Sequence, residues 1–342
     1  MKAVLYDRPE SFSVTELKMP KVGKKQVLIK VALCGVCGTD VHIHKGEFIS
    51  QFPLTPGHEF VGEVIEVGEE VTGIEVGSRV AVDNTILCGH CYYCKRNQPL
   101  YCENFYSLGC TGPGGFAEYV VAKFDKVFPI DGLTYEQAVM VEPISCAVHG
   151  LDKIDVQPGD SALLFGAGPT GIVLAQLLKH SGVSNLVVAA PAGPKLELVK
   201  KILDVEVVEL SRTDHQKHVV EVQQRYPRGF DIVIDATGVP SVLQGSVQFA
   251  KFGAKIVVYG VCDESDRIEL SPYAIFHKEL KIIGSFAQTH CFDRAVEYLQ
   301  RGIVNVDDFV THRFSLNEFE QALNQVAHGK DHIKVVVDPT LV

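Results

Sequence analysis

Apolar residues are distributed differently in the two halves of the chain. Up to about residue 140, short β-branched runs such as VLIKVAL (27–33) and FAEYVVA (116–122) alternate with glycine and proline. Short strands with frequent turns predict an all-β, barrel-like domain. From about Ala147 the pattern changes to apolar strands that alternate with helical segments. This second pattern predicts a parallel, doubly wound sheet.

The second half has six predicted strands, over 161–165, 185–190, 205–210, 231–235, 255–259 and 281–284. An amphipathic segment over 291–302, a helical pattern over 316–326 and a last strand over 333–338 follow. Because this C-terminal piece is short, we expect it to pack back on the first domain. The sequence therefore predicts an α/β protein with two domains, as its length of 342 residues also favours.

A glycine-rich turn, LLFGAGPTG over 163–171, joins the first of these strands to a helical segment. Gly166, Gly168 and Gly171 have the GxGxxG spacing. The first glycine permits the turn, the second lets a pyrophosphate approach the backbone, and the third lets helix and strand pack closely. The helix N-terminus adds unpaired amides and a positive dipole end. We therefore expect a dinucleotide to bind at Gly166, Ala167, Gly168, Pro169, Thr170 and Gly171.

The end of the second predicted strand bears on the choice of cofactor. NAD-binding proteins place an acidic residue there, about 20 residues past the glycines, on the ribose 2′-hydroxyl. This chain has Ala190, with Lys195 as the nearest cation and Arg212 as a second candidate. The absence of a carboxylate favours NADP over NAD. Alternatively, Lys195 is a solvated helix residue and NAD binds without its usual partner, because one lysine lacks the bidentate geometry of arginine.

Four cysteines crowd into one short segment, CGHCYYCKRNQPLYC. Cys88, Cys91, Cys94 and Cys102 have the spacing CxxCxxCx7C. Four soft sulfurs with no open position are typical of a closed, tetrahedral, structural zinc site. The metal would substitute for the hydrophobic core that this segment lacks.

Cys37 opens CGTDVH, and His58 and Glu59 lie in PGHEF. A thiolate, an imidazole and a carboxylate form a mixed donor set that leaves room for water or substrate, which is the catalytic pattern. From these residues alone, a core cysteine and a hydrogen-bonded histidine remain an alternative interpretation.

Charge and hydropathy exclude other classes of function. Lys and Arg number 32 against 42 Asp and Glu, a net charge of −10, which argues against a nucleic-acid or anionic-membrane partner. No run of about 18 apolar residues is present. We therefore expect a cytoplasmic protein that acts on a small molecule.

CGTDVH, GHEFVGEV, the cysteine segment, GxGxxG and DATG (235–238) occur in the order found in zinc-containing medium-chain alcohol and polyol dehydrogenases. The chain resembles this family, and its polyol branch in particular, over essentially its whole length. The resemblance implies a GroES-like catalytic domain over 1–146 and 286–342 and a Rossmann domain over 147–285. It also implies an active site in the cleft between them, two zinc ions per chain and a homodimer or homotetramer.

The resemblance also implies roles for single residues. Cys37 and His58 would hold the catalytic zinc with Glu59, and Glu142 of EPISC would either coordinate that zinc or bind its water. Thr39 would accept the substrate proton and His42 would pass it to solvent. Thr237 of DATG would contact the nicotinamide ribose, although an ordinary turn is equally compatible with DATG. Glu142 as an exposed acid and His42 as a surface histidine are the simpler alternatives.

The activity implied is zinc-dependent, NADP-preferring oxidation of a secondary hydroxyl of a sugar alcohol to the ketose, and the reverse. Sorbitol dehydrogenases commonly carry Phe-Arg-Tyr where this chain has Phe286, Ala287 and Gln288, so arabinitol or xylitol is favoured over sorbitol. A threonine-type amino-alcohol dehydrogenase is the alternative enzyme. A non-enzymatic NADP(H)-binding protein is the alternative from another class.

Overall fold

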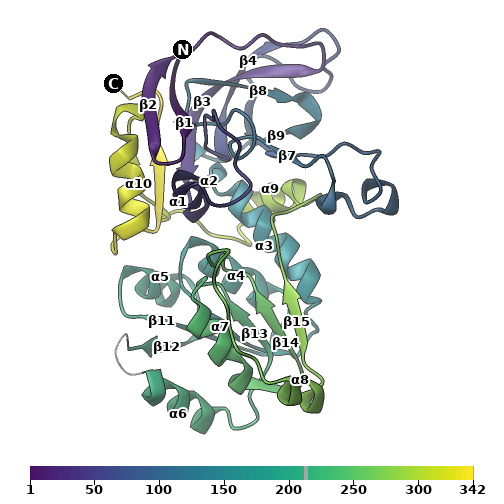
Figure 1. Cartoon of the computed structure of the whole chain (residues 1–342), viewed down its shortest axis with the longest axis vertical. Coiled ribbons are helices and arrows are strands. Elements are labelled where there is room, and N and C mark those ends of the chain that lie inside the picture. The colour runs from purple at the N-terminus through teal and green to yellow at the C-terminus, as the bar shows by residue number, and fades with distance from the viewer. Residues whose placement is uncertain (212–214, 342) are drawn as a thin grey trace. The chain divides into compact units, whose positions relative to one another are not determined.

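The computed structural model describes residues 1–211 and 215–341 (Figure 1). The chain forms two compact units. Unit 1 consists of residues 1–145, 288–302 and 306–342, and unit 2 consists of residues 146–287 and 303–305. Both ends of the chain therefore belong to the same unit.

Unit 1 is built mainly from strands. These are β1 (Lys2–Arg8), β2 (Ser11–Glu16), β3 (Gln26–Val36), β4 (Glu59–Val67), β5 (Arg79–Val82), β6 (Thr85–Ile86), β7 (Tyr106–Ser107), β8 (Tyr119–Lys123), β9 (Val127–Pro129), β16 (Val310–Phe314) and β17 (Lys334–Val337). Its helices are α1 (Gly38–Lys45), α2 (Tyr135–Ala138), α9 (Phe292–Gln300) and α10 (Phe319–His328), and α3 (Val141–Ile154) begins here and continues into unit 2.

The main sheet of unit 1 has the order β16-β17-β3-β4-β5-β9, and β8 also pairs with β3. β17 pairs antiparallel with β3, with Val336 opposite Gly35. The C-terminal strand therefore lies beside the strand that leads into Cys37, and the C-terminal piece packs back on the first part of the chain as the sequence predicts.

The core of unit 1 packs this sheet against α10. Phe319, Ala322 and Leu323 of α10 are buried, which is the i, i+3, i+4 spacing of one helix face. The ring of Phe319 lies 4.8 Å from that of Phe116 and 6.3 Å from that of Tyr6. This packing holds β1 and the loop before β8 in one apolar cluster.

Unit 2 alternates strands and helices. Its strands are β10 (Ser161–Phe165), β11 (Asn185–Pro191), β12 (Glu206–Leu210), β13 (Phe230–Asp235), β14 (Ala250–Val258) and β15 (Lys281–Gly284). Its helices are α4 (Pro169–His180), α5 (Pro194–Ile202), α6 (His215–Arg225), α7 (Pro240–Ser246) and α8 (Pro272–Lys278).

The strands of unit 2 form one parallel sheet in the order β12-β11-β10-β13-β14-β15. This order reverses direction between β10 and β13, which is the topological switch point of the Rossmann fold. Ala162, Leu163 and Leu164 of β10 are fully buried, as expected of a parallel strand covered on both faces.

The six strands predicted for this part of the chain are present. The largest difference is in β14, which begins at Ala250 rather than at 255. Its register against β13 is irregular, because Phe230 pairs with Ala250 whereas Ile232 pairs with Lys255. Residues 250–254 (AKFGA) precede the regularly paired part of β14. They do not form the continuous apolar run by which the sequence predicts the other strands of this sheet.

Candidate metal centres and dinucleotide site

The junction of β3 and α1 positions Cys37. β3 ends at Val36, and Cys37 is the N-cap residue of α1. The backbone N–H of Cys37 donates to Asp40 Oδ2 at 2.9 Å, which satisfies an amide that has no partner within the helix. The Cys37 thiol donates to Thr39 Oγ1 at 3.7 Å. The hydroxyl of Thr39 therefore lies beside the sulfur of Cys37.

His58 and Glu59 reach the same place from β4. The register of β4 on β3 puts Glu59 opposite Gly35, two residues before Cys37. His58 and Glu59 are 5% and 2% exposed. One donor atom from each of Cys37, His58 and Glu59 lies within 4.8 Å of the others. The structure thus brings together the mixed donor set that the sequence predicts.

This donor set suits a zinc ion. It supplies one sulfur, one imidazole nitrogen and one carboxylate oxygen, and three protein ligands are the usual number in a catalytic zinc site that keeps one position for water or substrate. Glu142 lies in the first turn of α3 and is not a member of the group. Among the described residues, Glu59 is therefore the carboxylate that completes this group.

Asp40 supports two of the three donors and escaped the sequence analysis. Its side chain is 2% exposed, Oδ2 accepts from Cys37 N–H, and Oδ1 lies 3.6 Å from His58 Nδ1. A carboxylate on one ring nitrogen leaves the other nitrogen for a metal. Burial lowers the pKa of His58, but Cys110 and Asp40 outweigh burial and raise the pKa well above its usual range. Metal binding, which needs neutral imidazole, would therefore release a proton.

The end of α1 pairs His42 with Glu47. Gly46 adopts the left-handed conformation (φ 80°) that terminates the helix, and the Glu47 N–H then donates to the His42 carbonyl at 2.9 Å. The same turn places Glu47 Oε2 2.6 Å from His42 Nδ1. His42 is thus oriented by a carboxylate that the sequence analysis did not identify.

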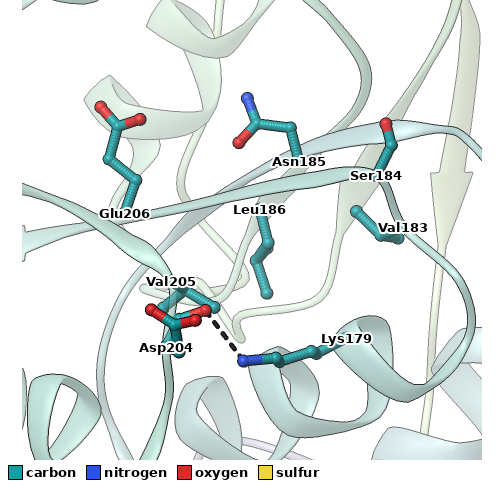
Figure 2. A pocket seen from close by; sticks show the side chains of 8 residues that line it. All are labelled: Lys179, Val183, Ser184, Asn185, Leu186, Asp204, Val205 and Glu206. Atoms are coloured by element: carbon teal, nitrogen blue, oxygen red, sulfur yellow. Dashed lines mark hydrogen bonds between the residues drawn. The ribbon is translucent and has the colours of Figure 1, made fainter.

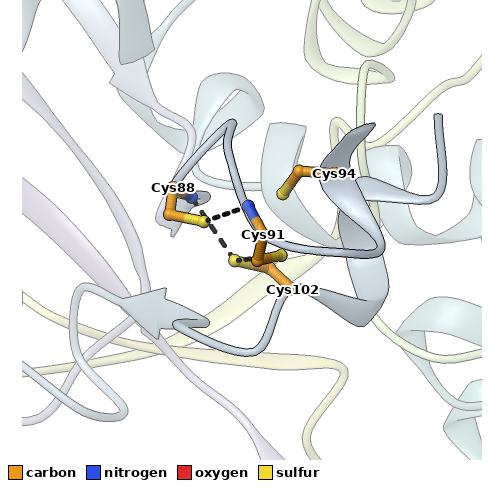
Figure 3. A group of neighbouring side chains, drawn as sticks. All are labelled: Cys88, Cys91, Cys94 and Cys102. Carbon is orange, nitrogen blue, oxygen red and sulfur yellow. Dashed lines mark hydrogen bonds between the residues drawn. The ribbon is translucent and has the colours of Figure 1, made fainter. Parts of the chain in front are cut away.

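The four cysteines of the second set surround one point (Figure 3). Their sulfur atoms all lie within 4.8 Å of one another, and Cys91 Sγ is 3.9 Å from Cys102 Sγ. Backbone N–H groups point at the sulfurs, with Cys91 N 3.4 Å from Cys88 Sγ. His90 is exposed, and its Nδ1 lies 2.8 Å from the Cys88 carbonyl oxygen. Its ring therefore contacts the backbone and is not a fifth member of the group of four sulfurs.

The thiols of this set are electrostatically unequal. The backbone N–H of His90 is the main cause that lowers the pKa of Cys88 to about 5. Desolvation and the neighbouring thiol of Cys91 raise the pKa of Cys94 to about 12. The backbone N–H of Cys94 also lowers the pKa of Cys91, so the segment favours thiolates at Cys88 and Cys91 and resists one at Cys94. A dication at the centre would remove that resistance, because metal-bound thiols are deprotonated.

The glycine-rich turn has the shape expected of a pyrophosphate site. Gly166 has φ +107°, and a Cβ on Gly171 would lie 2.2 Å from the Gly166 carbonyl oxygen. Gly168 is the N-cap of α4 and Pro169 follows it, so no side chain caps the first amides of that helix. The turn also lies at the end of β10, next to the switch point with β13.

Thr237 lies against this turn. A Cβ on Gly166 would be 3.1 Å from Thr237 Cγ2. The Thr237 hydroxyl and N–H both bind Asp235 Oδ1, at 2.5 and 2.9 Å. Asp235 is fully buried, and burial raises its pKa. The hydroxyl of Thr237 thus stabilises the turn after β13 by binding Asp235, while its methyl group lies next to Gly166.

The segment after β11 contains no carboxylate. Ala190 is 3% exposed near the end of β11, and Lys195 lies in the first turn of α5. Burial lowers the pKa of Lys195, so this ammonium group is less hydrated than a surface lysine. Arg212, the second candidate cation, lies outside the described residues.

Gln288, which occupies the position compared with sorbitol dehydrogenases, is fully buried. Its side-chain amide donates to Asp83 Oδ1 at 2.6 Å, and Lys126 Nζ donates to Asp83 Oδ2 at 2.7 Å. The amide nitrogen of Gln288 therefore belongs to a hydrogen-bond network with Asp83 and Lys126 within unit 1.

A separate cavity of about 240 Å³ lies at the amino ends of two strands of the unit 2 sheet, the opposite end of the strands from the glycine-rich turn (Figure 2). It adjoins the starts of β11 and β12, whereas the glycine-rich turn lies at the end of β10. Lys179 reaches across it and donates to the Asp204 carbonyl at 2.8 Å. This cavity is therefore distinct from the dinucleotide site.

Two known domain families match successive parts of the chain. Residues 23–132 match the alcohol dehydrogenase GroES-like domain, and residues 169–301 match the zinc-binding dehydrogenase domain. The chain is 46% identical to D-arabinitol dehydrogenase 1 of Uromyces fabae over 340 residues, which cover 99% of this chain and 97% of that protein. The chain belongs to the zinc-containing medium-chain dehydrogenase family.

The chain is also similar to more distant proteins. L-threonine 3-dehydrogenase of Idiomarina loihiensis is 31% identical, with 93% of each chain covered. A zinc-binding dehydrogenase from Sinorhizobium meliloti 1021 bound to NADP is 32% identical, with a TM-score of 0.92 and 99% of each chain covered. An alcohol dehydrogenase from Escherichia coli CFT073 in complex with NADH is 32% identical, with a TM-score of 0.89 and the same coverage.

Membership of this dehydrogenase family makes the protein an enzyme, an oxidoreductase that acts on a small molecule. Its fold combines a GroES-like part with a Rossmann-type part. Among the described residues, every helix is too short or too polar to cross a membrane.

Proposed function

We propose that this enzyme oxidises a secondary hydroxyl of a sugar alcohol to the ketose, and catalyses the reverse reduction, with zinc and NADP. The observation that carries the proposal is the convergence of Cys37, His58 and Glu59 within 4.8 Å. The 46% identity to a D-arabinitol dehydrogenase favours arabinitol, and then xylitol, as substrate. The more distant threonine dehydrogenase makes an amino alcohol the alternative substrate.

In this proposal Cys37, His58 and Glu59 hold the catalytic zinc, and Glu142 assists from the first turn of α3. A bound zinc ion supplies Lewis acidity that lowers the pKa of a coordinated hydroxyl toward neutrality. Asp40 fixes the His58 ring and the Cys37 backbone, so the donors keep their geometry. Cys88, Cys91, Cys94 and Cys102 hold a second, structural zinc, which gives two zinc ions per chain.

Thr39 and His42 carry the proton away from the substrate hydroxyl. They stand three residues apart on α1, so they share one face of that helix. Thr39 lies next to the Cys37 sulfur and accepts the proton first. His42 then passes it to solvent, and Glu47 holds the ring by Nδ1 so that the other nitrogen is the acceptor.

The nucleotide would be held by the part of the chain that we assign as the Rossmann domain, 147–285, and NADP bound there would supply the hydride acceptor. Residues 166–171 bind the pyrophosphate, and Thr237 contacts the nicotinamide ribose. Ala190 leaves room for a 2′-phosphate and Lys195 provides its counter-charge. The GroES-like catalytic domain then comprises 1–146 and 286–342, in a cytoplasmic homodimer or homotetramer.

An initial-rate survey tests the function. C4 to C6 polyols and L-threonine are each offered with NADP and with NAD, after metal analysis has counted zinc per chain. Oxidation of a pentitol with NADP supports the proposal. Oxidation of threonine but not of pentitols would replace it with the amino-alcohol alternative, and cofactor binding without turnover would favour a non-enzymatic binding protein.

Ala190→Asp tests the choice of cofactor. A carboxylate at the end of β11 repels a 2′-phosphate and accepts hydrogen bonds from a free ribose. We expect the ratio of kcat/KM for NADP over NAD to fall by at least about tenfold, an energy of roughly 1.4 kcal/mol. An unchanged ratio would mean that residues other than those at this strand end hold the phosphate.

A further inference from the structure

A buried lysine stands behind the mixed donor set. Lys334 begins β17, and its ammonium group forms an ion pair with Glu59 Oε2. The two side chains are 4% and 2% exposed. Lysine is almost never buried to this extent unless it is paired, because its charge loses hydration. Glu59 is also the carboxylate of the donor set, so the same side chain faces both a lysine and the metal position.

The backbone is adapted to this pair. Gly35 of β3 lies opposite Glu59 on one side and opposite Val336 of β17 on the other. A Cβ at position 35 would lie 2.1 Å from Glu59 Oε2 and 2.7 Å from Lys334 Cε. Any other residue would therefore displace the ion pair. The central strand of the sheet has a glycine where the pair crosses it.

The charges around the pair fit a dication. Cys37 as thiolate, Asp40 and Glu59 contribute three negative charges to this buried region. Lys334 cancels one of them, and a zinc ion would cancel the other two. Without Lys334 the occupied site would carry a net negative charge.

We propose that Lys334 is a positioning residue that competes with the metal for Glu59 and thereby limits how tightly the site holds zinc. The lysine binds one oxygen of Glu59 and leaves the other oxygen as a single, weakened ligand. This keeps the carboxylate near the metal position but readily released, which suits a site that must exchange water and substrate. The inference rests on the proposed function in one respect, that the mixed set holds zinc.

Removing the lysine should therefore tighten zinc binding. Lys334→Met deletes a positive charge next to a dication and leaves the Glu59 charge buried without its partner in the metal-free protein. Both effects favour the metal-bound state. A lysine with only a structural role would have the opposite signature, because loss of a supporting contact weakens metal binding about 10- to 100-fold.

The test is zinc affinity, measured by competition with a chromophoric chelator. Cys37→Ser identifies which of the bound zinc ions belongs to the mixed set. We expect Lys334→Met to bind this zinc at least tenfold more tightly than the wild type. Thermal unfolding should show a lower midpoint for the metal-free variant and a midpoint close to wild type once zinc is added. Lys334→Arg, which keeps the charge, and Lys30→Met, which removes an exposed lysine of β3, should stay within threefold of the wild type.

The outcomes separate this inference from the proposed function. If wild type and Cys37→Ser bind the same number of zinc ions, the mixed set holds no metal and the proposed function fails. If wild type binds zinc there but Lys334→Met binds it no more tightly, only the role of Lys334 is overturned. Should Lys334→Met not fold, Lys334→Gln takes its place, because the amide can still donate a hydrogen bond to Glu59 but carries no charge. Tighter zinc binding by Lys334→Gln than by the wild type supports the competition, and equal binding overturns it.

Discussion

The two cysteine-containing donor sets of unit 1 are built in different ways. The four-sulfur set comes from a single segment, 88–102, whose regular structure consists of two three-residue 3-10 turns, Cys94–Arg96 and Pro99–Tyr101. The mixed set takes its donors from the end of β3 and the start of β4 in the main sheet. It is also supported by a carboxylate from α1 and a lysine from β17.

This difference shows which site depends on metal for its shape. Tyr92, Tyr93 and Tyr101 in the cysteine segment are all exposed, so the segment buries little apolar surface, and a metal held by its sulfurs would substitute for the missing core. Around the mixed set, hydrogen bonds, an ion pair and strand pairing fix the donors without metal. We therefore expect metal loss to unfold one site locally and to inactivate the other without unfolding it.

Cys37→Ser should produce the largest loss of activity. It removes the thiolate from the mixed set while β3 and α1 stay in place. Because a catalytic metal contributes several kcal/mol to the transition state, turnover should fall by about a thousandfold or more. Binding of NADPH, followed by its fluorescence, should persist. Retained turnover would remove zinc from the mechanism.

Cys94→Ser should instead damage structure. The segment contains its own protease sites, since Lys95 and Arg96 are exposed next to Cys94. Loss of one sulfur should open the segment and accelerate tryptic cleavage there by roughly tenfold or more. Mass spectrometry of the fragments measures this. Cys37→Ser is the matched control, and equal cleavage in both variants would contradict the distinction between the two sites.

Asp40→Asn should weaken the mixed set without touching a donor. The amide keeps the shape of the side chain but loses the charge that faces His58. We expect zinc affinity of this set to fall about 10- to 100-fold, the usual effect of losing a supporting carboxylate. Chelator competition is the measurement, and zinc bound by the four-sulfur set would serve as the internal reference. An unchanged affinity would show that strand geometry alone orients His58.

Glu47→Gln should have the smallest effect. The substitution leaves His42 in place but removes the charge that orients its ring. Turnover should therefore fall by about tenfold, which is a smaller loss than removing a general base would cause. Stopped-flow rates in H₂O and D₂O should show a larger solvent isotope effect in the variant. Glu63→Gln, on an exposed position of β4, is the control. If both variants behave alike, Glu47 only terminates the helix.

Much of this architecture could be predicted from local patterns. The parallel strands of unit 2 are continuous apolar runs, and the glycine-rich turn follows the first of them. The donors Cys37, His58 and Glu59 were also predictable, because each belongs to a short motif. Such features depend on neighbouring residues in the chain, so they are visible in the sequence.

The supporting residues could not be predicted in the same way. Lys334 pairs with a residue far away in the sequence, and from its local pattern it is simply the polar start of a strand. Asp40 lies within CGTDVH, where its position three residues after an N-cap is a usable signal that the sequence analysis passed over. Glu47 depends on the left-handed turn at Gly46, which brings it back to His42. Contacts of this kind follow from tertiary packing.

The pairing of β17 with β3 has a consequence for the order in which the molecule forms on the ribosome. Unit 2 is nearly continuous in sequence, so it can fold as soon as it has been synthesised. The part of the main sheet that pairs with β17 must wait, because β17 is made after all of unit 2. A nascent chain therefore leaves residues 34–36 of β3 unpaired on that side throughout the interval, and premature termination before Lys334 would release a polypeptide in which unit 2 is complete but Glu59 lacks its ion-pair partner.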